Sequence, residues 1–202
     1  MMARNITRLV SVAFVAVAAA GCSSAPSHFY TLASTATGGG APAANYAVVV
    51  GPVSVPALVD RPQFAVQVAA NRVELDVFNR WAAPLNDNIA RVVTGDLAVL
   101  LGTPRVATAP LANFDPTYRV TIDVQRFESV PSEEKRNAAV LVEAVWVVSK
   151  SASEAARSGR TVARESAQGA GYDALAAAYS RALAKVSGDI AAAIRAQADE
   201  KP

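Results

Sequence analysis

The first half of the apolar pattern predicts strands. Residues 46–50 form an uninterrupted apolar run, which is typical of a strand buried on both faces. Apolar and polar residues alternate in 63–68 and again in 72–77, and a short turn containing Asn71 separates the two runs. Two alternating runs around a short turn predict a β-hairpin.

The next segment has the periodicity of an amphipathic helix. Pro84 lies where such a helix would begin, and Gly102 lies where it would end. Gly95 inside the segment costs about 1 kcal/mol relative to alanine, so we expect close packing there. The apolar stripe between these ends recurs every three or four positions: Leu85, Ile89, Val92, Val93, Leu97, Leu100 and Leu101.

Further strands and a second helix follow. We expect strands at 105–108, 118–125, 138–149 and 161–167, with a polar loop at 150–159 and a long helix from Tyr172 to Ile194. The strand at 118–125 alternates, which predicts one buried and one polar face. Adjacent alternating runs favour antiparallel pairs, and the first helix favours a crossover between strands. The pattern therefore predicts a single α/β domain with a mixed β-sheet over residues 46–202.

The N-terminus has the features of a lipoprotein signal peptide. Arg4 and Arg8 precede an apolar stretch of about a dozen residues, which is too short to span a bilayer. Small residues then lead to Cys22, although Ala19 stands where such signals usually have leucine. We expect cleavage after residue 21 and a lipid anchor on Cys22. The alternative is an ordinary signal peptide followed by an incidental cysteine.

The residues after the cysteine indicate a tether and a location. Residues 22–45 are rich in Ser, Ala, Pro and Gly, so they predict a flexible tether. The stretch 28–32 has strand composition and could dock on the domain. Ser23 follows the cysteine, whereas an aspartate there is the usual signal for retention in the inner membrane of enteric bacteria. We therefore expect the outer membrane.

Composition excludes several classes of function. Removing residues 1–21 leaves 181 residues (202 − 21), and Lys+Arg falls from 19 to 17 against 17 Asp+Glu. A net charge near zero disfavours nucleic acid as a partner. The one cysteine would carry lipid and the one histidine, His28, lies in the tether. We therefore expect no disulfide, no metal, no cofactor and no catalytic activity.

A few carboxylates could still carry chemistry. Glu74 and Asp76 share the polar side of a predicted strand, where solvent exposure is the more common explanation. Glu143 interrupts an apolar run, and a carboxylate there is costly unless it has a partner. We expect it either on a half-exposed face or beside an arginine on the neighbouring strand.

Two segments combine arginine with proline or tryptophan at strand ends, 58–63 and 78–85. Trp and Arg are enriched among the residues that dominate binding energy at protein interfaces. The candidate residues for contact with a partner or with other copies of the chain are Asp60, Arg61, Gln63, Arg80 and Trp81. Equally, Trp81 could pack on the helix while Arg80 pairs locally.

These motifs resemble a known family. Val-Pro-x-Leu-Val-Asp-Arg-Pro-Gln occupies 55–63, Arg-Trp-Ala-x-Pro-Leu opens the helix at 80–85, and Arg-Phe-Glu occupies 126–128. With Tyr-x-Leu at 30–32, this order is similar to the PqiC/YmbA family of ABC-type transport auxiliary lipoproteins. The resemblance implies a three-layer α/β/α domain that faces the periplasm and assembles as a ring. It also implies work with an MCE-domain protein of the inner membrane in moving phospholipid between membranes.

Two functions remain open. The chain could be a non-catalytic adaptor subunit of such a transport system, or a stand-alone periplasmic carrier that binds a lipid or other apolar ligand in its own pocket. An adaptor needs a surface for self-assembly and no closed apolar cavity, whereas a carrier needs the cavity.

Overall fold

The computed structural model describes residues 25–38, 44–69, 71–109, 114–130, 139–151 and 156–200. The predicted signal peptide and Cys22 lie outside these ranges. Within the described residues, neither helix is long and apolar enough to span a bilayer.

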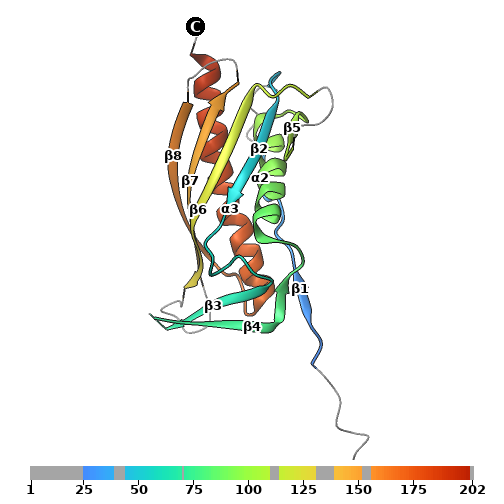
Figure 1. Ribbon diagram of the computed structural model, residues 1–202, viewed down its shortest axis with the longest axis vertical. Coiled ribbons are helices and arrows are strands. Elements are labelled where there is room, and N and C mark those ends of the chain that lie inside the picture. The colour runs from blue at the N-terminus through green and yellow to red at the C-terminus, as the bar shows by residue number, and fades with distance from the viewer. Residues whose placement is uncertain are drawn as a thin grey trace, which may run out of the picture.

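A five-stranded mixed sheet is the larger of two sheets (Figure 1). Its strands, in spatial order, are β5 (Val106–Ala107), β2 (Val48–Ser54), β6 (Tyr118–Val130), β7 (Ala139–Lys150) and β8 (Ala156–Ser166). β2 is parallel to both β5 and β6, while β6, β7 and β8 are antiparallel neighbours. The prediction of an α/β domain with a mixed sheet and a crossover is confirmed.

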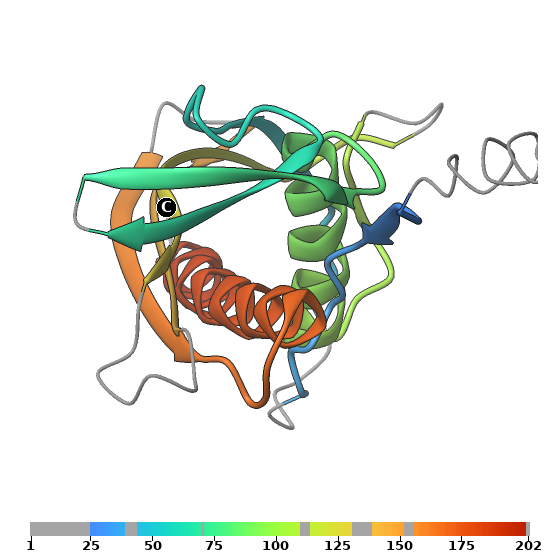
Figure 2. The same cartoon turned by 90° about the horizontal axis from the view of Figure 1, so that it is seen from below.

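Two helices cover this sheet: α2 (Leu85–Leu101) and α3 (Tyr172–Asp199). α3 packs on β7 and β8, α2 packs on β2 and β5, and the helices also contact each other. Figure 2 shows both helices inside the curve of the same sheet. Pro84 and Gly102 flank α2 as predicted, and Gly102 adopts the left-handed conformation (φ 64°) that ends the helix.

The implied three-layer arrangement is corrected to two layers, because both helices lie on one face of the large sheet. The alternation in β6 gives the physical reason. Its apolar side is buried against the helices, while the opposite side is exposed and needs no second helical layer. The exposed side carries Arg119, Thr121, Asp123 and Gln125.

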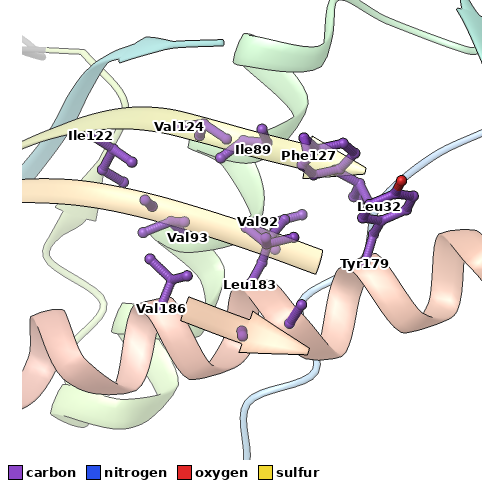
Figure 3. Packing of buried hydrophobic residues seen from close by; sticks show 14 of the residues in the cluster. Leu32, Ile89, Val92, Val93, Ile122, Val124, Phe127, Tyr179, Leu183 and Val186 are labelled. Carbon is purple, nitrogen blue, oxygen red and sulfur yellow. The ribbon is translucent and has the colours of Figure 1, made fainter. Parts of the chain in front are cut away.

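Side chains fill the space between the helices and the sheet. Figure 3 shows residues of α2, β6 and α3 meeting in one cluster, with Leu32 of the N-terminal segment at its edge. The labelled members are all buried: Leu32, Ile89, Val92, Val93, Ile122, Val124, Phe127, Tyr179, Leu183 and Val186.

A three-stranded sheet closes one end of the domain. It consists of β1 (His28–Tyr30), β4 (Arg72–Trp81) and β3 (Gln63–Ala69), with β4 in the centre. β3 and β4 form the predicted antiparallel hairpin, and β1 adds to β4 in parallel. This small sheet lies opposite the end where the chain terminates (Figure 1).

Residues 28–38 pack on the folded domain. The expectation that 28–32 could dock there is met by β1, which pairs with β4, whereas the sequence analysis left residues 33–38 in the tether. Beyond β1, the chain runs along α2 and α3 and is held by Asp96, a fully buried carboxylate of α2. Asp96 accepts hydrogen bonds from the Ser34 hydroxyl at 2.6 Å and from the Thr35 and Ala36 backbone N–H groups at 3.0 and 3.1 Å. The Ser187 hydroxyl of α3 donates to its second oxygen at 3.0 Å.

Two local predictions are also resolved. A Cβ on Gly95 would lie 3.1 Å from Cβ of Ser34, so the expected close packing is confirmed and its partner is the N-terminal segment. β8 begins at Ala156, whereas the sequence analysis placed a polar loop up to residue 159.

Candidate functional site

Aromatic residues join the small sheet to the rest of the domain. Phe64 of β3 stacks on Trp81 of β4 with ring centroids 4.1 Å apart, and Phe127 of β6 stacks on Tyr179 of α3 at 4.0 Å. Trp81 lies 6.1 Å from both Phe127 and Tyr179 and links the two stacks. Tyr172 packs edge-on against Phe64 at 5.1 Å. Burial raises the pKa of Tyr179 above its ordinary value.

Trp81 is therefore packed in the core, and it also lines the groove described below, so its role as a contact residue stays a prediction. Only 5% of the surface of Trp81 is exposed, and Phe64 stacks on one face of its ring. The structure agrees with the alternative given in the sequence analysis, in which Trp81 packs inside the domain. Its ring lies where β3, β6 and α3 meet, next to Phe64, Phe127 and Tyr179.

Of the other candidate residues, Asp60 and Arg61 line a solvent-open groove of about 310 Å³, and Gln63 and Arg80 are next to lining residues in the sequence. β3–β4 pairing places Gln63 opposite Arg80, and the Trp81 N–H donates to the Pro62 carbonyl at 2.6 Å. This pairing draws the 60–62 loop against the residues that precede α2. The groove is lined by Asp60, Arg61, Pro62, Trp81, Ala82, Ala83, Pro84 and Leu85.

Two arginines beside this groove have no acidic partner. Arg61 donates to the Ala57 carbonyl at 3.4 Å, and Arg80 donates to the Val77 carbonyl at 2.7 Å. In the ranges that the structure describes, no carboxylate lies within 4.0 Å of either guanidinium. Both charges are thus available to an external group, which keeps Arg61 and Arg80 as candidate contact residues.

Asp76 of β4 accepts several hydrogen bonds, one of which connects the small sheet to α3. Its carboxylate accepts hydrogen bonds from the Tyr172 hydroxyl at 2.7 Å and from the Asn79 amide at 3.0 Å. The backbone N–H groups of Phe78 and Asn79 donate to it as well, at 2.8 and 2.9 Å. The Tyr172 hydrogen bond is the main reason that the Asp76 pKa falls to about 2, with Asn79 and Phe78 adding to it. These hydrogen bonds give the Asp76 carboxylate a structural role. Glu74 is exposed and forms an ion pair with Arg72.

Apolar side chains are exposed at the same end, and sequence reasoning missed them. Six of the nine exposed large hydrophobic side chains among the described residues lie on β1, on β4 or in the loop before β3. We call this set the apolar end: Phe29, Leu58, Val73, Leu75, Val77 and Phe78. An alternating strand shows that one side is apolar, but only the structure shows whether another layer covers that side.

The remaining carboxylate and histidine candidates do not form a reactive site. Glu143 is buried and forms an ion pair with Arg160 of β8, so the expectation of an arginine across the sheet is confirmed. His28 is exposed on β1. No group of three or more His, Cys, Asp or Glu side chains in the described part of the chain could hold a metal ion.

Comparisons with known proteins agree with this arrangement. The family model for the ABC-type transport auxiliary lipoprotein component matches residues 30–191. A crystal structure of a Xanthomonas campestris protein shares the fold with a TM-score of 0.67 and 21% identity, over 84% of this chain and 99% of that one. A crystal structure of an uncharacterized protein matches with a TM-score of 0.64 and 19% identity over the same shares. No curated protein matches the sequence significantly.

Proposed function

This chain belongs to the family of ABC-type transport auxiliary lipoprotein components, and we propose that it is a non-catalytic adaptor in a system that moves phospholipid between membranes. In this proposal, the lipid on Cys22 holds it to the outer membrane and the folded domain faces the periplasm. Its partner is an MCE-domain transport protein anchored in the inner membrane. The family match carries the proposal, because it spans β1 to α3 and so includes both sheets and both helices.

The packed interior supports an adaptor over a carrier. A carrier for an acyl chain needs an enclosed apolar pocket of several hundred Å³. Here the space between the large sheet and the helices is occupied by fully buried Val, Ile and Leu side chains. The groove beside Arg61 is open to solvent and borders charged residues, so it suits a protein or headgroup better than a buried acyl chain.

Assembly into a ring requires two different surfaces on each subunit, because head-to-tail contacts join unlike patches. The groove lined by Asp60 and Arg61, with Gln63 at the start of β3 next to it, offers one such surface. The uncovered face of the large sheet offers another, where Val162 of β8 is exposed. We propose that these two surfaces meet between neighbouring subunits.

A genetic experiment tests the adaptor role. We expect deletion of this gene to sensitise cells to membrane-damaging agents to the same degree as deletion of the partner transport gene, with no further effect in the double deletion. A Cys22→Ser version should fail to restore resistance, whereas wild type restores it. An additive double deletion would contradict the proposal, because it would mean that the two proteins act separately.

A biochemical experiment separates adaptor from carrier. Mass spectrometry of lipids extracted from the purified lipoprotein should find no phospholipid bound in a one-to-one ratio. A stoichiometric, non-covalent phospholipid would favour the carrier instead.

A further inference from the structure

Packing within the domain does not explain why the side chains of the apolar end are exposed. Phe29 is 64% exposed and Val77 is 52% exposed, although both lie in strands. Exposed apolar patches on folded domains mark contacts with a protein or a membrane. The position of the apolar end relative to the lipid anchor decides between a contact with a protein and a contact with a membrane.

The anchor and the apolar end are neighbours in the sequence. Phe29 is seven positions after Cys22 (29 − 22), and seven fully extended residue-to-residue steps span at most about 25 Å. Because residues 28–38 are fixed on the domain by β1 and Asp96, the chain has no further slack after His28. A lipid on Cys22 therefore holds the small sheet close to the bilayer.

The shape of the domain keeps the opposite end away. α3 has 28 residues and so is about 42 Å long, and it runs from Tyr172 at the small sheet to the far end of the molecule (Figure 1). Figure 2 shows the β3–β4 hairpin lying across the near end. The exposed apolar side chains therefore lie at the end of the domain that is nearer to the anchor.

Among the charged groups of β4, Arg72 and Glu74 form an ion pair and Asp76 accepts hydrogen bonds from Tyr172 and Asn79, which leaves Arg80 for a phospholipid headgroup. Arg80 pairs in register with Phe29, and its guanidinium has only the Val77 carbonyl as a partner among the described contacts. An arginine beside exposed apolar side chains can place its charge among anionic headgroups while the apolar groups enter the interface.

We propose that the apolar end rests in the headgroup region of the membrane that holds the Cys22 anchor, with Arg80 directed to anionic headgroups. Phe29 and the β4 side chains enter the interface, and α3 then points its C-terminal end toward the periplasm. The lipid and the small sheet together give two points of attachment, so the domain has a defined orientation. The proposal rests on the lipid anchor and is independent of the identity of the transport partner.

Site-specific fluorescence tests this orientation. Since Cys22 is the only cysteine and carries the lipid in this proposal, Val77→Cys and Val99→Cys each introduce one reactive thiol into the mature lipoprotein. Val99 is the matched control, because it is an exposed valine (44%) near the end of α2 that lies away from the small sheet. Each variant is labelled with an environment-sensitive fluorophore and reconstituted in phosphatidylethanolamine–phosphatidylglycerol vesicles with or without a nitroxide-bearing phospholipid.

We expect the nitroxide lipid to reduce emission from position 77 at least twofold and emission from position 99 only slightly. Adding Arg80→Gln to the Val77→Cys variant should weaken the quenching in these anionic vesicles but not in neutral phosphatidylcholine vesicles. Equal, weak quenching at both positions would overturn the proposal. A blue-shifted but unquenched signal at position 77 would also overturn it, because it would assign the apolar end to another protein surface.

Discussion

The two sheets use similar sequence patterns for different purposes. In β6 of the large sheet, alternate apolar residues such as Val120 and Ile122 are buried beneath α2 and α3. In β4 of the small sheet, Val73, Leu75 and Val77 alternate in the same way and remain exposed. Both strands contain the same residue types with the same period of two.

The difference lies in what each sheet packs against. The two helices lie along the large sheet, whereas the small sheet meets the body chiefly through Phe64, Trp81 and the aromatic rings next to them. The apolar side of the large sheet is therefore covered, whereas the small sheet leaves apolar side chains exposed. Substitutions in the two sheets should reveal this difference.

Trp81→Ala should have the largest effect on stability, because Trp81 is the part of the small sheet that belongs to the core. Truncating a buried tryptophan costs about 3–5 kcal/mol. Chemical denaturation should show a loss of this size, with a lower midpoint. A loss below about 1 kcal/mol would mean that Trp81 is a surface residue after all and that the aromatic joint does not hold the sheets together.

Gly159→Ala should disturb the large sheet alone. A Cβ at this position would overlap the indole of Trp146, whose Nε1–H donates to the Thr161 hydroxyl at 3.0 Å. Displacing a packed core ring costs about 1–3 kcal/mol. Near-ultraviolet circular dichroism should report the change around Trp146. Gly188→Ala is a suitable control, because its added Cβ meets nothing within 4 Å.

Asp76→Asn should change how stability depends on pH. The Asp76 pKa is about 2 in the folded protein and 3.8 in the reference state, so its contribution is present above about pH 3.8 and is lost as pH falls toward 2. We expect wild type to lose stability across this window and the variant to lose less. Parallel curves for the two proteins between pH 4 and pH 2 would show that the fold does not favour the ionised Asp76 carboxylate over its protonated form.

Val77→Ser should have the smallest effect on stability, within about 0.5 kcal/mol, because the side chain is exposed and packs on little. The matched substitution Val120→Ser, in the buried side of β6, should be clearly destabilising. Thermal unfolding of the two variants compares the sheets directly. A destabilisation of Val77→Ser equal to that of Val120→Ser would remove the distinction between them.

Local patterns predicted the elements well where neighbouring residues determine them. Pro84 and Gly102 indicated the ends of α2, and alternation indicated the β3–β4 hairpin. Glu143 indicated a partner because an unpaired buried carboxylate is too costly, and Arg160 meets that need.

Predictions were wrong where contacts between distant residues decide the outcome. Residues 34–36 have the composition of a linker, yet Asp96, some 60 positions later, binds their N–H and hydroxyl groups. Asp96 lies on the apolar stripe of α2, between Val93 and Leu97, and a carboxylate in that position was an available signal. No comparable signal distinguished the buried Trp81 from an exposed one.

The most direct test of the adaptor role is purification of the lipidated protein from native membranes after mild cross-linking, with the Cys22→Ser variant as control. We predict that an MCE-domain protein of the inner membrane co-purifies with wild type and is lost with the variant. Recovery of wild type without any transport protein, under conditions in which the protein remains membrane-bound, would contradict the account.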